Sequence, residues 1–288
     1  MAIESSAPPP QPASLRHFAW LYAPPLRRGA LAALFSMEEE IRVSASTELH
    51  HEVAHLRLQW WQGETARLAN GEGVHPLSRE LQLAAQAQHS RWPDLRPWVS
   101  AVQSTLARAT FQSGEHWRNH CGLWADSVWR CAAQLQAAAA AGEAVSEVFI
   151  SGAGAAVREI ELLLSLASDA RHGNINLPLE ELSAAGLTTA DCYRQPWVEP
   201  LATRIDARLG AARSSLRQCA AALAPQAWPS LRSLAAWIAL SDAAAHRAQQ
   251  GLPLALPADS ATLCSTVGAN FRAWRAARRA QALRGPLR

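Results

Sequence analysis

The sequence contains no lysine, so each of its 27 basic residues is an arginine. Opposed by 24 acidic residues, they leave a formal net charge of only +3. We interpret the arginine bias as a preference for GC-rich codons, because a charge this small marks no strongly basic surface. No nucleic-acid partner is expected.

Cysteine is scarce, and its spacing excludes two classes of protein. The five cysteines include no C-x-x-C pair; they are Cys121, Cys131, Cys192, Cys219 and Cys264. An odd number at such distances fits neither a disulfide framework nor a metal finger, and free thiols fit a reducing compartment. We therefore expect a cytoplasmic protein.

Long apolar runs are missing as well. No stretch reaches the run of about 18 apolar residues that a membrane-spanning helix needs. The N-terminus carries acid and proline where a secretory signal has a cation followed by an apolar core. We expect neither secretion nor a membrane-spanning helix.

Residues that favour strands are few. The chain has two Tyr and five Phe among 288 residues and no alternating Val/Ile/Thr pattern, whereas alanine dominates. Its hydrophobic content of 49% is ample for one large core. We therefore predict an all-α single domain.

Helix-period patterns and Gly/Pro breaks divide this domain. Residues 1–14 combine Pro, Ser and Ala with little to bury, so we predict that they are disordered and that the helical domain spans 15–288. The pattern indicates a bundle of about eight or more helices. The predicted helices span 25–46, 47–69, 77–88, 93–110, 113–141, 144–169, 197–224, 228–249 and 258–283.

His51, Glu52 and His55 form the H-E-x-x-H pattern of zinc proteases, in which two imidazoles bind Zn²⁺ and the glutamate activates water. Catalytic zinc normally takes three protein ligands. In the extended motif a Gly and a third His are needed, and Leu58 and Trp61 stand there instead. We expect no bound metal, and a zinc hydrolase is the third of three functional hypotheses.

Four segments of the chain match a set of family motifs that is unrelated to the zinc-protease pattern. In order they are Arg28–Met37 (RGALAALFSM), Leu56–Trp61 with Glu64 and His75-Pro76-Leu77, His120-Cys121 with Trp124–Trp129, and Gly154–Pro178. They resemble "RRALxALYAF", "RLxWWRxEL…G…HP", "YCxxVAGxVG" and "GxALQLTNILRDxxEDxxxGRxYLP" of the squalene/phytoene synthases. The likeness includes bacterial members that are similar to a mitochondrial complex I assembly factor.

The resemblance implies an isoprenoid-synthase-like bundle and a head-to-head joining of two allylic prenyl diphosphates. Releasing diphosphate requires neutralisation of several negative charges by Mg²⁺, a hard cation that binds carboxylates. The family supplies these carboxylates as two aspartate-rich motifs on facing helices.

This chain departs from both motifs. The D-D-x-x-D motif falls on Arg42, Val43, Ser44, Ala45 and Ser46, and the D-x-x-x-D motif falls on Ser165 and Asp169. Further along the resemblance, the neighbouring Gln and Asn become Arg158 and Glu161, and the Arg and Tyr of "GRxYLP" become Asn174 and Asn176. One of the five motif aspartates remains.

Glu38, Glu39 and Glu40 lie just upstream and could replace the first motif after a shift of one turn. Consecutive residues fan out by about 100° around a helix, so at most one or two could face one cavity. We favour a solvated acidic stretch balanced by Arg42. The remnants of a metal site are Glu39, Glu40 and Asp169.

The resemblance also predicts how much room remains in the cavity that holds the prenyl chain. Trp124, Asp126 and Trp129 replace the Val and two glycines of "VAGxVG". Two indoles would largely fill a prenyl-chain cavity, so we predict that Trp124 and Trp129 are buried there, with Trp129 the stronger candidate. Because the two positions are about 140° apart on a helix, the alternative is that one faces the cavity while the other packs against an outer helix. The other positions that the resemblance places at the pocket are Phe35, Met37, Trp61 and His120.

The arginines cluster only near the C-terminus, interleaved with alanine and Trp274; they are Arg272, Arg275, Arg278, Arg279, Arg284 and Arg288. Such a tail can contact phosphates or an anionic membrane, which would make the protein peripherally membrane-bound. A solvated helix face has the same pattern, and we favour it.

Three functions follow. The first is a pseudoenzyme that has lost prenyl transfer, with no catalytic residue and no cofactor, acting as a binding or assembly factor for an unknown protein partner or an isoprenoid lipid. The second is a divergent Mg²⁺-dependent transferase of farnesyl or geranylgeranyl diphosphate, or an isoprenoid-lipid binder. It would need a Mg²⁺ site assembled from Glu39, Glu40, Glu161 and Asp169. The zinc hydrolase is the third.

Overall fold

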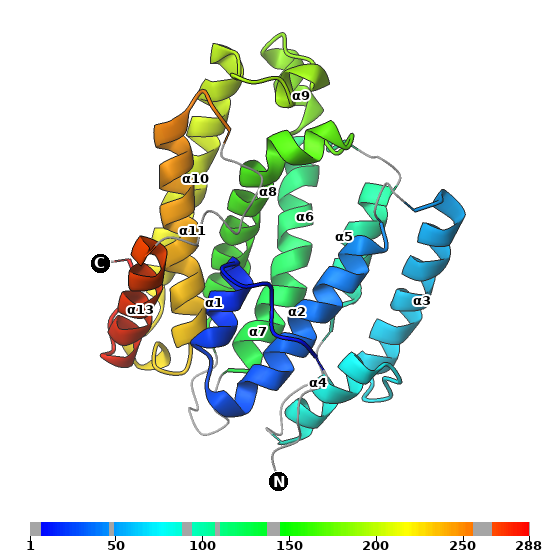
Figure 1. The fold of residues 1–288 in the computed structure, drawn as a ribbon, viewed down its shortest axis with the longest axis vertical. Helices are drawn as coiled ribbons and strands as arrows, with labels where there is room; N and C mark the ends of the chain where they lie inside the picture. Colours follow the sequence, from blue (N-terminus) through cyan, green and yellow to red (C-terminus); the bar gives the residue numbers. More distant parts are fainter. Residues whose placement is uncertain are drawn as a thin grey trace.

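The computed structural model describes residues 7–45, 49–87, 94–106, 110–136, 145–255 and 267–287, and within these ranges all regular structure is helical (Figure 1). The prediction of an all-α bundle is confirmed. The first half contains α1 (Leu15–Leu21), α2 (Arg28–Val43), α3 (His51–Ala69), α4 (Pro76–Ala87), α5 (Arg96–Leu106), α6 (Gly114–Trp124), the π-helical turn η2 (Ala125–Trp129) and α7 (Arg130–Gln134).

The second half begins with another π-helical turn, η3 (Phe149–Ala153), which leads into α8 (Gly154–Arg171). It continues with α9 (Leu179–Ala184), α10 (Glu199–Ala222), α11 (Arg232–Gly251) and α13 (Val267–Gln281). Most predicted ranges agree with these helices to within a few residues. Periodicity missed the short helices α1 and α9, and the predicted helix 25–46 is a 3-10 turn, Pro25–Arg27, followed by α2.

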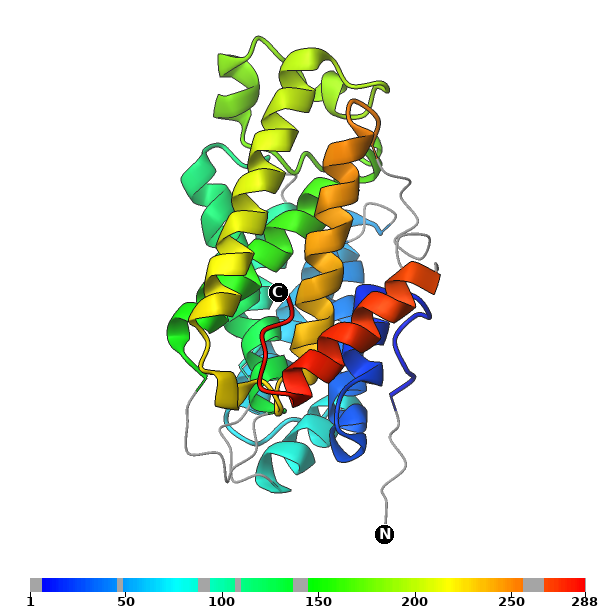
Figure 2. The ribbon, with the colours of Figure 1, turned by 90° about the vertical axis from the view of Figure 1, so that its left-hand side faces the viewer.

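Helix α8 lies at the centre of the bundle, between α6 on one side and α10 and α11 on the other (Figures 1 and 2). Ile160, Leu163 and Leu166 on α8 are at most 2% exposed. Helices α3 and α4 form one edge, where they pack on α5 and α2, and α13 lies along α11 at the opposite edge. In the described ranges no helix is long and apolar enough to cross a bilayer.

The segment before α1 is part of this assembly from Ala7 onward, which is buried. Ser14 caps α1, its hydroxyl oxygen accepting a hydrogen bond from the backbone N–H of His17 at 3.0 Å. Residues 1–6 lie outside the described ranges.

A buried carboxylate holds the loop between α3 and α4. Glu64 is fully buried and accepts hydrogen bonds from the backbone N–H groups of Val74 and His75 at 2.9 and 2.8 Å. Arg67, one turn along α3, donates to the same carboxylate at 2.7 Å. The Glu64 and His75-Pro76 positions of the resemblance are therefore joined physically: the carboxylate supplies the acceptors that these loop amides need.

The two π-helical turns face each other and let α8 approach η2 closely. A methyl group added at Gly154 would lie 2.8 Å from the Ala125 Cβ and from ring carbons of Trp129, a separation that real side chains do not tolerate. The small size of Gly154 is therefore a packing requirement. Gly122 on α6, in contrast, has open space where a side chain would begin.

Gly154→Ala should lower the free energy of unfolding by about 1 kcal/mol. Overpacking destabilises a core by about 1–3 kcal/mol, and the higher helix propensity of alanine offsets about 1 kcal/mol of this. Gly122→Ala is the matched control and should stabilise the protein by up to about 1 kcal/mol. Urea unfolding followed by circular dichroism measures both. Equal effects of the two substitutions would contradict the packing argument.

Candidate functional site

One glutamate of the acidic stretch lies on the apolar face of α2. Residue 38 is four positions after Leu34 and three before Ile41, both of which are fully buried. Glu38 is only 4% exposed. The expectation of a solvated acidic stretch is therefore wrong for Glu38, because helical spacing turns this position inward. It holds for Glu39, whose carboxylate pairs with Arg42 where both side chains are 58% exposed.

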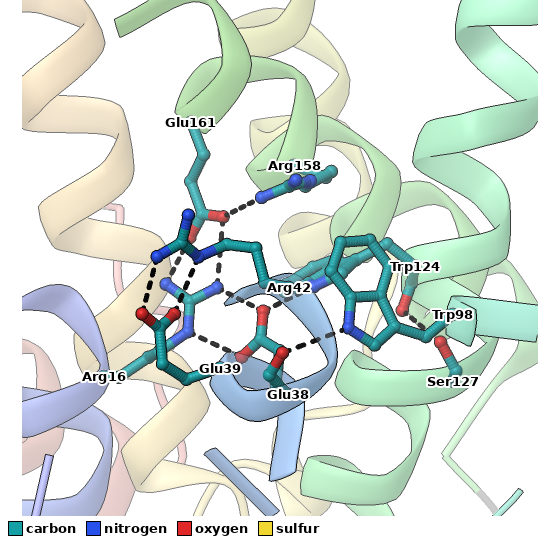
Figure 3. Close-up of polar contacts among 9 residues, drawn as sticks. All are labelled: Arg16, Glu38, Glu39, Arg42, Trp98, Trp124, Ser127, Arg158 and Glu161. Atoms are coloured by element: carbon teal, nitrogen blue, oxygen red, sulfur yellow. Dashed lines mark hydrogen bonds and ion pairs between the residues drawn. The ribbon is translucent and has the colours of Figure 1, made fainter. Parts of the chain in front are cut away.

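Arg16 of α1 lies between Glu38 on α2 and Glu161 on α8 (Figure 3). Its Nε and Nη2 donate to the two Glu38 oxygens at 2.7 and 2.6 Å, and its Nη1 and Nη2 donate to Glu161 at 3.2 and 3.3 Å. Arg158 donates to Glu161 at 3.1 Å. Two arginines and two glutamates thus form one neutral cluster that ties three helices together.

Indole groups surround this cluster. The Nε1–H of Trp124 donates to Glu38 Oε1 at 2.8 Å, and that of Trp98 donates to the Glu38 carbonyl at 3.3 Å. The Arg16 guanidinium lies over the ring of Trp237 at 5.3 Å, and that of Arg158 lies over Trp98 at 5.2 Å. At these distances the ring faces attract the cations, so the arginines are stabilised by carboxylates and by aromatic rings.

Arg16 and Glu38 stay ionised although they are buried, because each shifts the pKa of the other. Burial by itself would raise the pKa of Glu38, but the positive charge of Arg16 and hydrogen bonds from Arg16 and Trp124 hold that pKa below its ordinary value. Burial would lower the pKa of Arg16, and Glu161 and Glu38 reverse this and raise it. Both groups are therefore ionised near neutral pH.

Two cavities flank the cluster, and Arg42 and Arg158 line both. A cavity of about 480 Å³ lies among α2, α5, α6, α8 and the loop after α8, with Asp169 and His172 in its wall. A second cavity of about 970 Å³ lies between the segment before α1, α2 and the loop before α4; Pro8–Gln11, Phe35 and Glu38–Glu40 line it.

Two residues that line the smaller cavity carry polar atoms that no described residue satisfies. His120 is 3% exposed, and neither ring nitrogen has a hydrogen-bond partner. Burial, helped by the charge of Arg158, lowers the pKa of His120 to about 3, so its ring is neutral with one donor and one acceptor. The Nε–H of Arg158 is also unpaired in the described part of the chain. Buried polar groups normally have partners, so these atoms are exceptions; they are enclosed by the protein and are not accessible from the cavity.

Aromatic rings fill the space on the other side of the cluster. Trp124 and Trp129 are both fully buried, and Trp237 packs against them with ring-centre distances of 5.9 and 5.3 Å. Phe35 contacts Trp237 at 5.5 Å, and Phe149 contacts Trp129 at 6.2 Å. The indoles form a continuous aromatic core between α2, η2, η3 and α11.

The family model described as squalene/phytoene synthase matches residues 12–251, which is most of the chain. The chain belongs to the squalene/phytoene synthase family. A dehydrosqualene synthase solved with a ligand superposes with a TM-score of 0.69 at 10% sequence identity, covering 93% of this chain and 90% of that one. Squalene synthase HpnC from Alicyclobacillus acidocaldarius gives a TM-score of 0.65 at 17% identity, covering 81% and 87%. No curated protein sequence matches significantly.

The residues that the resemblance aligns with the family's first aspartate-rich motif lie at the C-terminal end of α2 and just after it. Arg42 there binds Glu39 through two hydrogen bonds of 2.7 and 2.6 Å. Ser44 is buried, and its hydroxyl donates to the carbonyl of Glu40 at 2.8 Å. Ser46 lies outside the described residues. A cation and small side chains thus replace the carboxylates.

At the position that the resemblance gives to the family's second motif, Asp169 is present, and its carboxylate is hydrogen-bonded. Its Oδ2 accepts hydrogen bonds from Ser165 and from Asn176, each at 2.6 Å. Both donors stand where the family pattern has other residues, an aspartate and a tyrosine. The remaining carboxylate therefore ties α8 to the following loop.

The other sequence-derived positions are dispersed. Asp126 is exposed and accepts from Arg130 at 2.9 Å, so it does not line either cavity. Met37 is fully buried, and Trp61 packs on His75 with ring centres 5.2 Å apart. Glu40 is exposed, 3.9 Å from His75.

The H-E-x-x-H residues lie on the outer face of α3. His51, Glu52 and His55 are all exposed, and the two Nε2 atoms are 3.0 Å apart. In the ranges that the structure describes, no group of three or more His, Cys, Asp or Glu side chains could hold a metal ion. The two imidazoles make one hydrogen bond with each other on the surface.

Sequence reasoning missed Arg16 altogether. The available signal was Glu38, a carboxylate at the position where the apolar stripe of α2 needs a large hydrophobic residue. Such a residue requires a buried partner, but the sequence does not name it, because Arg16 is 22 residues from Glu38 and 145 from Glu161.

Glu38→Gln should lower the free energy of unfolding by about 3 kcal/mol, because one partner of a buried ion pair is removed while Arg16 stays. The exposed Glu39→Gln is the matched control and should cost less than about 1 kcal/mol. The folded-state pKa of Glu38 lies below its ordinary value of 4.5, so its stabilisation is present above that pH and is lost as the pH falls through the folded pKa.

Urea titrations at pH 7 and at about pH 3.5 would measure this difference. The gap between the parent and Glu38→Gln should shrink on acidification. Equal costs for the two substitutions at pH 7 would show that the buried cluster contributes nothing beyond a surface pair.

Proposed function

We propose that this chain is a non-catalytic member of the squalene/phytoene synthase family that acts as a binding or assembly factor. The observation that carries the proposal is the placement of Arg16 between Glu38 and Glu161. The two glutamates lie on α2 and α8, the helices to which the resemblance assigns the family's two aspartate-rich motifs. Both carboxylates are bonded to guanidinium groups.

The donor set of this region does not fit Mg²⁺. That ion requires anionic oxygen ligands in near-octahedral geometry and is reluctant to lose its water. At Glu38 and Glu161 it would have to displace Arg16 and enter a cluster whose charge is already balanced. At the first motif it would meet Arg42, and at the second only Asp169, whose Oδ2 is hydrogen-bonded to Ser165 and Asn176. We derive no catalytic step through the metal.

The aromatic core supports the same proposal. The fully buried Trp124 and Trp129 stand where the family pattern has Val and Gly, residues that leave room for a prenyl chain. The packing of Gly154 against Trp129 leaves no space for even one added methyl group there. A long isoprenoid chain would need to displace these rings.

The purified protein should release no diphosphate from farnesyl or geranylgeranyl diphosphate above background, with or without Mg²⁺. A coupled diphosphate assay measures release, and calorimetric titration with the same compounds separates a failure to bind from a failure to react. Steady Mg²⁺-dependent turnover would overturn the proposal.

Binding of an isoprenoid lipid is a second candidate function, favoured by the two cavities beside the cluster. His120 and Arg158 line a space of about 480 Å³, large enough for a polar head group. The test is titration with farnesyl diphosphate without Mg²⁺. Saturable binding that is lost in Arg158→Gln would support this candidate. No binding would reject it in favour of a role in binding another protein.

Trp129→Gly should open a void in the aromatic core and cost about 3–5 kcal/mol of stability, as Trp→Ala does in cores. The half-exposed Trp60 provides the control, since Trp60→Gly has the same helix-propensity cost without an internal void. The Trp129 variant should also bind geranylgeranyl diphosphate more tightly than the parent. Unchanged stability together with unchanged affinity would show that Trp129 does not occupy ligand space.

A further inference from the structure

Helix α13 has its small side chains facing the protein and its large ones facing away. Its buried residues are all alanine: Ala269, Ala273, Ala276, Ala277 and Ala280. They pack on α11 and, at Ala269 and Ala273, beside Phe18 of α1. In contrast, Val267, Phe271 and Trp274 are 85%, 57% and 44% exposed. A surface helix normally places its largest apolar residues inward, so this arrangement is inverted.

The exposed apolar residues form one crest. Residues 267, 271, 274 and 278 are spaced by four, three and four, which at about 100° per residue places them within one narrow sector of the helix. The alanine stripe occupies the opposite side. Rings of Phe271 and Trp274 are 5.5 Å apart, and the Arg278 guanidinium lies 5.2 Å from the Trp274 ring centre. The helix lies on the outside of the bundle, across α11 (Figure 2).

The exposed arginines of α13 lie on the crest and along one flank of it, and the helix itself contains no acidic residue. Arg272, Arg275 and Arg278 are exposed along α13, and Arg284 follows in the next turn. All 24 acidic residues of the sequence precede position 260, whereas six of the 27 arginines follow position 271. The net charge is only +3, so without these six arginines the chain would be negatively charged. The basic character of the protein is thus concentrated on the aromatic helix.

We propose that α13 docks on the surface of an anionic membrane, with Phe271 and Trp274 inserted among the lipid head groups. Interfacial helices combine an apolar face with arginine or lysine, and tryptophan favours the boundary between head groups and acyl chains. The arginines meet the phosphates, each adding about 1 kcal/mol near a negative surface. The alanine face stays on α11, so the helix binds without leaving the bundle.

Charge decides between a membrane and a second copy of the chain. Two α13 helices packed face to face would bring their arginines together in a self-complementary contact with no carboxylate to pair them. An anionic bilayer supplies negative charge over its whole area. The outer face of α3 also exposes apolar side chains, Leu56 and Trp60 at 66% and 44%, but acidic Glu52 accompanies them there.

The experiment is co-sedimentation of the full chain with vesicles of phosphatidylcholine alone or mixed with phosphatidylglycerol. We expect binding to the mixed vesicles that weakens at high salt. Phe271→Ser/Trp274→Ser should abolish it, whereas Leu56→Ser/Trp60→Ser, which removes comparable exposure on α3, should bind as the parent does. Circular dichroism melting confirms that each variant is folded.

A second pair of variants tests the charge. Arg272→Gln/Arg275→Gln should weaken binding roughly 30-fold, or about fivefold for each arginine near the surface. Arg171→Gln/Arg194→Gln lowers the net charge equally at exposed sites elsewhere and should leave binding unchanged. No binding to the mixed vesicles, equal binding to neutral vesicles, or equal loss in both arginine pairs would each overturn the proposal.

Discussion

The centre of this molecule depends on the pairing of Arg16 with two carboxylates. Glu38 and Glu161 lie on two different helices, α2 and α8, and either charge alone in this low-dielectric setting would cost several kcal/mol. With Arg16 and Arg158 beside them the charges cancel, and hydrogen bonds satisfy both carboxylates. The cluster requires Arg16 of α1 to lie between α2 and α8, and it requires the Trp124 indole to point at Glu38.

The cluster also fits the proposed non-catalytic role, because it joins α2 and α8 without a pair of facing aspartates. Opposed carboxylates that lack a metal repel each other and favour separation of their helices. An internal guanidinium joins α2 and α8 instead, and it comes from the same chain. In the proposed role, this region is neutral and internally paired and does not recruit cations from solvent. A cavity lined by His120 and Arg158 nevertheless lies beside it.

Tryptophan serves opposite purposes in two parts of the structure. In the centre, Trp124, Trp129 and Trp237 fill space and cover charges, and all three are fully buried. On α13 the inward side chains are alanines, which allow close helix contact but leave Trp274 no place inside. The difference lies in the neighbouring residues and not in the indole itself. Interior stability and a candidate interaction surface thus arise from one residue type.

The sequence by itself determined the helical class, most helix positions and the family, because apolar periodicity, Gly/Pro breaks and motif order are local properties of the chain. It also showed that the aspartates were absent. Only the tertiary structure decided where the charged side chains lie: Glu38 is turned inward, Arg16 of α1 pairs with it, and Asp126 is exposed. It likewise decided that α13 exposes its aromatic residues. Helical spacing indicates which residues share a face, but which face is covered depends on contacts between distant segments, such as that between Tyr22 and Arg232, 210 residues apart.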